Sequence, residues 1–248
     1  MSENAFEAIA GSGPLLLLCD HASNALPPGL GTLGLPPELL DTHIAHDIGA
    51  ATVTRALAAA WGAPALLGRW SRLLVDLNRG ADDPTIVMKL SDGSIIPGNR
   101  DAGPDAMARR IALYHAPYHA AIAAELDRIG PGAVIVSIHS FTPRWKAVPR
   151  IWEVGILYDA DIRLAHPLMA RLRAAGFTVG DNEPYSGALE NDTLNVHGTR
   201  RGLPHVLVEL RQDLIADAAQ AQAFAARLKP LLDAALDDMR GAALHGPD

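Results

Sequence analysis

Four short, mainly apolar runs, each followed at once by polar residues capable of chemistry, constrain this chain more than any other feature. The runs and the polar residues after them are 15–19 before Asp20 and His21, 73–75 before Asp76, Asn78 and Arg79, 133–138 before His139, and 206–208 before Glu209. Short apolar runs are typical of β-strands buried on both faces. Because ligands of open α/β sheets bind outside the carboxyl ends of the strands, the pattern predicts a catalytic site there, with a metal.

Helical patterns separate these runs, so the chain is predicted to be an α/β protein. We expect strands at 64–68, 72–77 and 154–158 as well, and helices at 37–61, 105–129, 160–175 and 216–240. Strands that alternate with helices imply a mostly parallel sheet covered on both faces. The segments 80–104, 141–152 and 180–203 are expected to be functional loops. The 248 residues contain no internal repeat or linker, so we predict a single domain over 1–248.

Composition and charge argue against several other classes of protein. The formal net charge of −7 offers nucleic acid little attraction, and no uncharged apolar stretch of about 18 residues predicts a membrane span. The chain has one cysteine, Cys19, and its N-terminus lacks the pattern of a signal peptide, so we predict a cytoplasmic protein. No glycine-rich phosphate-binding loop is present.

His21 and His139 are the first candidate metal ligands, because each follows a predicted strand and neutral imidazole binds zinc well. A catalytic zinc takes three protein ligands as a rule, and a carboxylate suits the third position. Asp47 is the first choice, since we expect it on the helix after the first loop, facing the sheet edge. The alternatives for this third position are Asn24, His43 and His46.

Glu209 is the candidate general base, because it ends a valine-rich strand and a carboxylate near a metal can activate water. An ordinary ion pair is the alternative role for this residue. Residues two apart on a strand share a face, so Arg211 is its expected partner in that case.

The residues predicted to bind substrate are mostly cationic, which favours a substrate with a carboxylate. Arg79 presents a planar fork that binds carboxylates in bidentate fashion, and it is also a candidate to stabilise the oxyanion. The other candidates are Asn78, His197, Arg211 and the basic residues of 141–150 and 197–201. His115 and His119 have a spacing of four residues that can bind metal, but a helix-surface or packing role is expected for them.

Six motifs, in their order and spacing, resemble the N-formylglutamate amidohydrolase family, specifically a shorter branch of it. They lie at 20–24, 43–50, 71–79, 114–119, 137–140 and 202–209, and the resemblance covers about 15–236. It implies a three-layer α/β/α hydrolase fold with a mixed central sheet, like that of zinc carboxypeptidases and aspartoacylases. It also implies zinc-dependent hydrolysis of an N-acyl amino acid, with Asn78 and Arg79 as substrate ligands. The carboxypeptidase pattern has a Glu three residues after the first zinc histidine, where this chain has Asn24.

The resulting hypothesis is a zinc-dependent amidohydrolase with His21, Asp47 and His139 as metal ligands and Glu209 as general base. Another divalent metal can replace zinc in this scheme. The expected partner is a small-molecule substrate with a carboxylate. Binding to nucleic acid or to a membrane is not expected, and a homo-oligomer is compatible with the sequence. Two alternatives are a metallopeptidase or aminoacylase acting on other N-acyl amino acids or short peptides, and a non-catalytic module that binds an amino-acid derivative.

Overall fold

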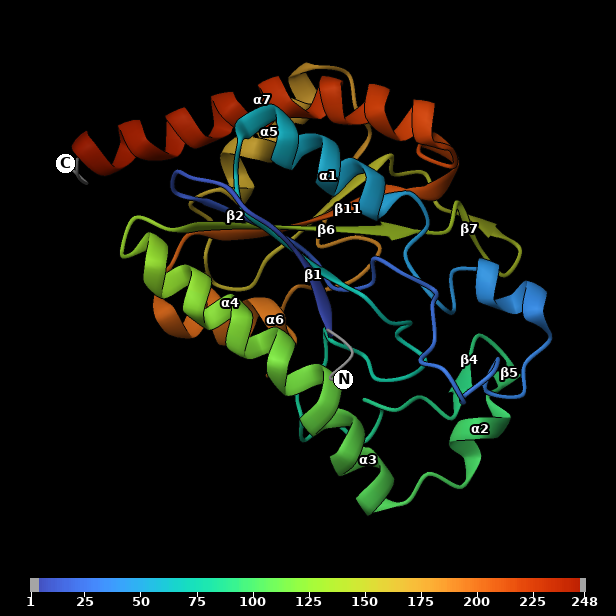
Figure 1. Cartoon of the computed structure of the whole chain (residues 1–248). Helices are drawn as coiled ribbons and strands as arrows, with labels where there is room; N and C mark the ends of the chain where they lie inside the picture. The colour runs from blue at the N-terminus through green and yellow to red at the C-terminus, as the bar shows by residue number, and fades with distance from the viewer. Residues whose placement is uncertain (1–4, 246–248) are drawn as a thin grey trace.

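A computed structural model describes residues 5–245, which form a seven-stranded mixed sheet between two layers of helices (Figure 1). The strands are β1 (Phe6–Ile9), β2 (Leu15–Cys19), β3 (Ala65–Gly68), β6 (Val134–Phe141), β9 (Val154–Leu157), β10 (Val179–Asp181) and β11 (His205–Arg211). Their order is β1-β3-β2-β6-β11-β9-β10. The central strands β3, β2, β6 and β11 are parallel, whereas β1 pairs antiparallel with β3 and β9 antiparallel with β11.

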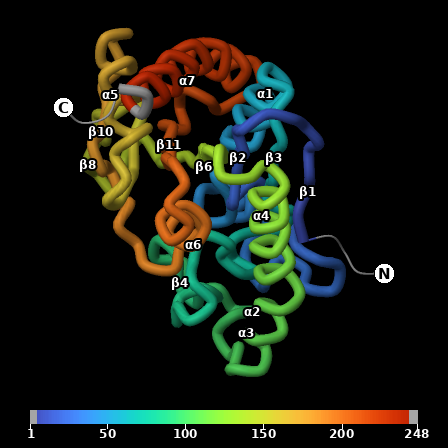
Figure 2. The backbone as a smooth tube through the Cα atoms, turned by 90° about the vertical axis from the view of Figure 1, so that its left-hand side faces the viewer, coloured from blue at the N-terminus to red at the C-terminus, as the bar shows by residue number. Residues whose placement is uncertain are grey.

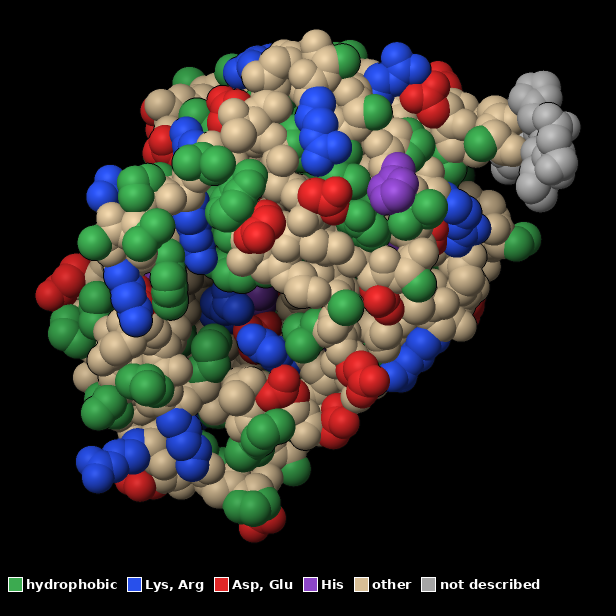
Figure 3. All heavy atoms as spheres, turned by 180° about the vertical axis from the view of Figure 1, so that it is seen from behind, with side chains coloured by type: hydrophobic (Ala, Val, Ile, Leu, Met, Phe, Trp, Pro, Cys, Tyr) green, Lys and Arg blue, Asp and Glu red, His purple; other side chains and the backbone are tan. Residues whose placement is uncertain are grey.

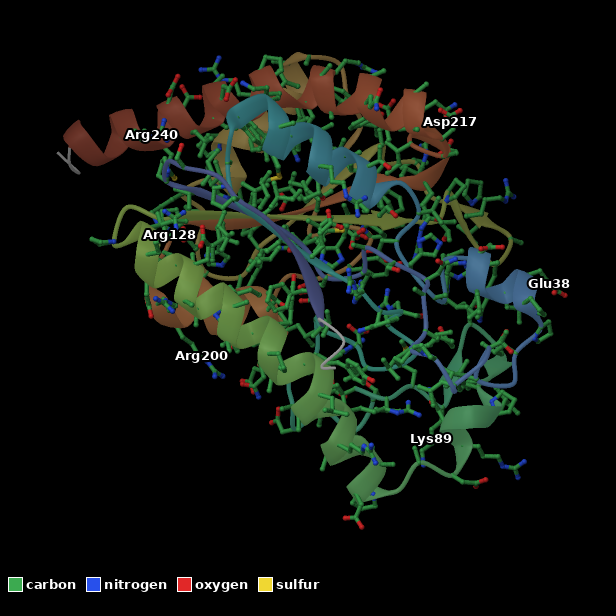
Figure 4. All side chains as sticks on the ribbon, in the orientation of Figure 1. Glu38, Lys89, Arg128, Arg200, Asp217 and Arg240 are labelled. Carbon is green, nitrogen blue, oxygen red and sulfur yellow. The ribbon has the colours of Figure 1, made fainter. Side chains whose placement is uncertain are left out.

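Helices cover both faces of this sheet, which confirms the predicted three-layer α/β architecture. One face carries α1 (Ala50–Trp61), α5 (Ala165–Ala174) and α7 (Ala218–His245), and the other carries α4 (Ala116–Ile129) and α6 (Thr193–His197) (Figures 1 and 2). Strand β2 shows why. All its residues are buried, but Leu17 packs into the core beneath α1 and α7, and Leu16 and Leu18 pack into the core beneath α4. Charged side chains such as Glu38, Asp217 and Arg240 lie at the periphery (Figure 4).

The expected loops contain short elements of their own. Segment 80–104 holds the hairpin of β4 (Leu90–Ser91) and β5 (Ser94–Ile95) and helix α2 (Pro97–Arg100), and segment 141–152 holds the hairpin of β7 (Arg144–Trp145) and β8 (Val148–Pro149). Helix α3 (Pro104–Arg110) joins α4 through a π-helical turn, Ile111–His115. Short 3-10 turns lie at Pro37–Asp41, Thr199–Arg201 and Gln212–Leu214.

The predicted strand at 72–77 is wrong: this segment is a buried series of turns. Side chains take the hydrogen-bonding role that a neighbouring strand would have. Asn99 Nδ2 donates to the Leu73 carbonyl at 2.7 Å, and Arg110 Nη1 donates to the Leu74 carbonyl at 2.9 Å. Burial makes the run apolar, as in a strand, but the carbonyls of Leu73 and Leu74 bond to side chains instead of to a neighbouring strand.

The predicted helix over 37–61 is also too long, because α1 begins only at Ala50. Gly49 interrupts it with a positive φ of 81°, and a Cβ there would lie 2.2 Å from the Ile215 carbonyl oxygen. This close approach requires glycine and forces a turn. Asp47 therefore lies in the turn before α1, not on the helix.

No helix within the described residues is long and apolar enough to cross a membrane. The remaining helix and strand predictions differ from the structure mainly at their ends. Strands β1 and β10 were not predicted, and the expected loop at 180–203 contains helix α6. The helix expected at 216–240 extends to His245.

Candidate active site

A cavity of about 290 Å³ opens at the carboxyl ends of β2, β6 and β11, on the side of the sheet that faces α4. The surface is hollowed here, and positively charged and histidine side chains are visible inside the hollow (Figure 3). His21, His139 and Glu209 reach this cavity from three adjacent strands, as expected for an α/β sheet. The turn before α1 adds Asp47, and the turns at 76–79 add Asn78 and Arg79.

His21, Asp47 and His139 converge, with one ligand-capable atom of each lying within 4.8 Å of the others. The Oδ2 atom of Asp47 lies 2.9 Å from His139 Nδ1 and 3.4 Å from His21 Nδ1. All three side chains are buried. Two imidazole nitrogens and a carboxylate oxygen around one point form a donor set that suits zinc and leaves room for a fourth ligand.

Two further carboxylates orient the imidazoles. His21 Nε2 lies 2.7 Å from Asp76 Oδ1, and His139 Nε2 lies 2.9 Å from Asp20 Oδ2. Histidines that bind metals commonly donate the other ring nitrogen to a carboxylate in this way. Both Nδ1 atoms therefore face the common point, and the residues present fit a divalent metal.

Arg72 connects the two carboxylates on either side of His21, and sequence reasoning assigned it no role. Its Nη1 lies 3.4 Å from Asp47 Oδ1, and its Nη2 donates to Asp76 Oδ2 at 2.9 Å. Burial raises the pKa of Asp47, but the imidazoles of His21 and His139 outweigh it and hold that pKa well below its usual range. Burial lowers the pKa of His139, but its hydrogen bonds to Asp20 and Asp47 outweigh this effect and raise it.

Glu209 lies directly opposite His139 in the parallel pairing of β11 with β6. Its side chain is buried, and its Oε2 has no hydrogen-bond partner among the described residues. Burial raises the pKa of Glu209 to about 7. A buried carboxyl group with an unsatisfied oxygen and a pKa near neutrality is suited to exchange protons with a reacting molecule.

The alternative ion pair of Glu209 with Arg211 is not formed. Arg211 instead donates through Nε to Asp213 at 2.7 Å and through Nη1 to three backbone carbonyls, including that of Trp152 at 3.3 Å. Arg211 is not among the residues that line the cavity. Its predicted role in substrate binding is therefore not supported by its position.

Asn78 and Arg79 line the cavity, where the sequence analysis expected them. The Asn78 N–H donates to Asp76 Oδ1 at 3.0 Å, and Asn78 Oδ1 accepts the Thr193 N–H at 3.2 Å. Arg79 is about one-third exposed, and its Nη1 lies 3.5 Å from Asp83 Oδ2. This long contact is the only side-chain hydrogen bond of Arg79 within residues 5–245, so most of its guanidinium donors are unpaired there.

The alternative third ligands lie outside the cluster. Asn24 Nδ2 donates to Asp41 Oδ1 at 2.9 Å on the exposed surface. His43 lines the cavity but pairs with Asp92 at 3.2 Å, and His46, although next to Asp47 in sequence, is not part of the cluster.

His115, His119 and His197 form a stack behind the turns that carry Asn78 and Arg79. The ring centroids of His115 and His119 are 4.1 Å apart, and those of His119 and His197 are 5.1 Å apart. His119 Nε2 bonds the Leu77 carbonyl at 2.9 Å, His115 Nε2 bonds the Arg79 carbonyl at 2.8 Å, and His197 Nε2 bonds His119 Nδ1 at 2.9 Å. His197, predicted to bind substrate, thus lies outside the cavity lining.

This stack is uncharged near neutral pH, because burial lowers the pKa of each of its three imidazoles. A carbonyl only accepts, so His119 Nε2 carries the proton, and the neutral Nδ1 accepts from His197. Burial, together with the neighbouring imidazoles, lowers the pKa of His119 to about 4 and that of His197 to about 3. The neutral stack therefore fixes the backbone of the turns at 77–79.

Replacing His119 with Ala is expected to raise KM about tenfold while changing kcat little. The substitution releases the Leu77 carbonyl and the His197 ring, so Arg79, which the sequence analysis predicts to bind substrate, loses its fixed position at a cost of about 1.4 kcal/mol of binding energy. Steady-state kinetics with the metal-loaded enzyme check this result. His166→Ala, an exposed histidine on α5, is the control. An unchanged KM, or equal losses in kcat and kcat/KM, would contradict a positioning role.

Comparison with known proteins settles the family. The sequence profile of N-formylglutamate amidohydrolases matches residues 13–216. The chain belongs to this family. It is similar to the gene product Atu2144 from Agrobacterium tumefaciens, with 36% identity over 96% of this chain and 97% of that one and a TM-score of 0.91. The N-formylglutamate amidohydrolase from Ralstonia eutropha JMP134 has the same fold, with 22% identity over 97% and 100% of the two chains and a TM-score of 0.70.

No curated protein sequence shows significant similarity to this chain. The family match nevertheless confirms the resemblance that the six motifs indicated. The match shows that this chain is an amidohydrolase. In the structure, His21, Asp47 and His139 form a group that could hold a metal ion.

Proposed function

We propose that this chain hydrolyses the amide bond of an N-formyl amino acid, such as N-formylglutamate, with zinc or another divalent metal held by His21, Asp47 and His139. Membership of the family supports the reaction class. The observation that carries the proposal is the juxtaposition of this buried cluster with Glu209, whose Oε2 has no partner among the described residues.

When bound, the divalent metal would polarise the scissile carbonyl and lower the pKa of water. Glu209 accepts a proton as water adds to the formyl carbon. It then delivers this proton to the amide nitrogen as the C–N bond breaks, which releases formate and the free amino acid. A pKa of about 7 allows Glu209 to carry out both transfers near neutral pH.

Arg79 and Asn78 bind the α-carboxylate of the substrate in this proposal. The stacked histidines hold the turns at 77–79 from behind, so the guanidinium of Arg79 remains directed into the cavity. Asp20 and Asp76 orient the two imidazoles, and Arg72 holds Asp47 and Asp76 in place. Each of these groups is fixed before substrate arrives, which is how a protein lowers the cost of reaching the transition state.

Formate release from N-formyl amino acids tests the proposal. Protein loaded with zinc is expected to release formate and amino acid in equal amounts, and protein treated with a chelator is expected to lose this activity and regain it when zinc is restored. Equal turnover with and without a chelator would contradict the metal mechanism. Binding of N-formyl amino acids by zinc-loaded protein without any turnover would instead support a non-catalytic binding module.

The second candidate is a metallopeptidase or aminoacylase that uses the same groups on other N-acyl amino acids or short peptides. A panel of N-acetyl amino acids and dipeptides, assayed beside the N-formyl compounds, separates the two.

A further inference from the structure

We infer that the amino-acid part of the substrate carries one carboxylate and a large apolar side chain, which packs against an aromatic wall of the same cavity. This inference rests on the proposed reaction, hydrolysis of an N-formyl amino acid, and specifies the amino acid: it favours an apolar side chain over that of glutamate. N-formylglutamate has two carboxylates, whereas an N-formyl derivative of phenylalanine or leucine has one. The cationic groups of the cavity and the composition of its lining distinguish these substrates.

The cavity offers one guanidinium for a substrate carboxylate. Among the described residues that line it, the arginines are Arg72 and Arg79. Arg72 is engaged with both Asp47 and Asp76, so its charge is already balanced by carboxylates of the protein. Arg79 has only the 3.5 Å contact with Asp83. One bidentate site therefore remains, which matches one carboxylate.

A second substrate carboxylate would meet negative charge. Asp92 and Asp192 also line the cavity, and the imidazole of His43 at the rim is already paired with Asp92 at 3.2 Å. Asp192 uses one oxygen to accept the Asn195 N–H at 2.7 Å. Like charges brought together in a partly buried site repel one another, so these acids disfavour a dianion.

Several other lining residues form an apolar wall next to the metal cluster. Phe141 follows His139 by two residues on β6, and Leu207 precedes Glu209 by two residues on β11, so each shares a sheet face with a site residue. Leu157 lies opposite Leu207 in the pairing of β9 with β11. Trp145, on the β7–β8 hairpin, and Tyr185 extend this wall to the surface.

Trp145 and Tyr185 remain 42% and 44% exposed, although both line the cavity. Large exposed aromatic side chains beside a cavity indicate a binding surface. The segment that carries Tyr185 is anchored, because Asn182 Oδ1 accepts the N–H groups of Tyr158 and Gly187, each at 3.0 Å. The wall is therefore held in place before substrate binds.

Arg150 supports this wall from outside the cavity lining. Its guanidinium lies 5.3 Å from the Trp145 ring, 5.1 Å from the Tyr185 ring and 5.8 Å from the Phe141 ring. Its Nη1 donates to Thr142 Oγ1 at 3.0 Å. Cation–π contacts of this kind fix the three rings relative to one another.

The test compares kcat/KM of the zinc-loaded enzyme for the N-formyl derivatives of phenylalanine, leucine, glutamine and glutamate. We expect kcat/KM for N-formylphenylalanine and N-formylleucine to exceed that for N-formylglutamate about tenfold or more. A site rejects a charged side chain more strongly than it rejects a change in the size of an apolar one. Glutamine, which has the shape of glutamate without its charge, is expected to exceed glutamate as well. A preference for glutamate over both apolar substrates overturns the inference.

Two variants sharpen this comparison. Trp145→Ala should lower kcat/KM for N-formylphenylalanine about tenfold and leave N-formylalanine nearly unchanged. Val148→Ala, an exposed residue of the same hairpin that does not line the cavity, is the matched control. If Arg150→Met selectively reduced hydrolysis of N-formylglutamate, Arg150 would be a second carboxylate site and the inference would be wrong.

Failure of the proposed function gives a different result. If no N-formyl compound releases formate, the reaction class is wrong, and calorimetric binding of the same compounds to zinc-loaded protein still tests the inference. N-formylphenylalanine must then bind more tightly than N-formylglutamate. Equal or reversed affinities overturn the apolar side-chain site regardless of catalysis.

Discussion

Glu209→Gln is expected to lower kcat by about 10²–10⁴-fold and leave zinc affinity nearly unchanged, because the substitution removes the group that exchanges protons but none of His21, Asp47 and His139. Glutamine has almost the same shape, so the cavity should keep its structure. Single-turnover kinetics of formate release and competition with a chromophoric chelator measure the two quantities. Turnover within a few-fold of the wild-type enzyme would rule out Glu209 as the general base.

The same variant should stabilise the metal-free protein at alkaline pH. Burial raises the pKa of Glu209 from 4.5 to about 7 in the folded chain. Between these values the folded state binds more protons than the unfolded state, so stability falls as pH rises through this window. The full penalty, on the order of 3 kcal/mol, is present above pH 7 and absent below the unfolded pKa.

Thermal unfolding in the presence of a chelator checks this effect. Glu209→Gln is expected to raise Tm by about 5–10 °C at pH 8 and to change it little at pH 4.5. Glu38→Gln, which removes an exposed carboxylate at the periphery of the molecule (Figure 4), is the control and should show no such dependence. A Tm shift of the same size at both pH values would contradict a raised pKa. Together with the kinetics, the result would show that this site trades stability for activity.

His139→Ala is expected to abolish detectable hydrolysis and to weaken zinc binding by more than about 100-fold. Removing a group that only orients a metal ligand typically lowers metal affinity about 10–100-fold, and removing the ligand itself lowers it more. The substitution also leaves Asp20 and Asp47 buried without their shared partner, which should destabilise the metal-free protein by about 3–5 kcal/mol. Zinc competition and calorimetry measure these changes.

His43→Ala is the matched control for this experiment, because His43 lines the same cavity but lies outside the metal-ligand cluster. It should keep zinc affinity within a few-fold of the wild type. Asp47→Asn provides a second test if His139→Ala does not fold, since it retains the shape of the side chain and weakens one ligand. Unchanged zinc affinity in both variants would show that the metal, if any, binds elsewhere.

The sequence by itself determined the parts of the site that depend on local patterns. Apolar runs identified β2, β6 and β11, and the residues just after or at the end of these runs, His21, His139 and Glu209, line one cavity because parallel strands present their carboxyl ends at one edge. The six motifs indicated the family, which the profile match confirmed. Both kinds of information are carried by residues close together in the chain.

Only the tertiary structure decided which distant groups surround these three residues. Asp47 reaches the histidines because Gly49 turns the chain against the Ile215 carbonyl, a contact between segments far apart in sequence. The segment 73–75 is buried like a strand, but its carbonyls at Leu73 and Leu74 bond to Asn99 and Arg110, which no local pattern indicates. Arg72 and the histidine stack likewise depend on long-range packing. The spacing of apolar residues is a local property of the sequence. Hydrogen-bond partners from distant segments, in contrast, are determined only when the whole chain folds.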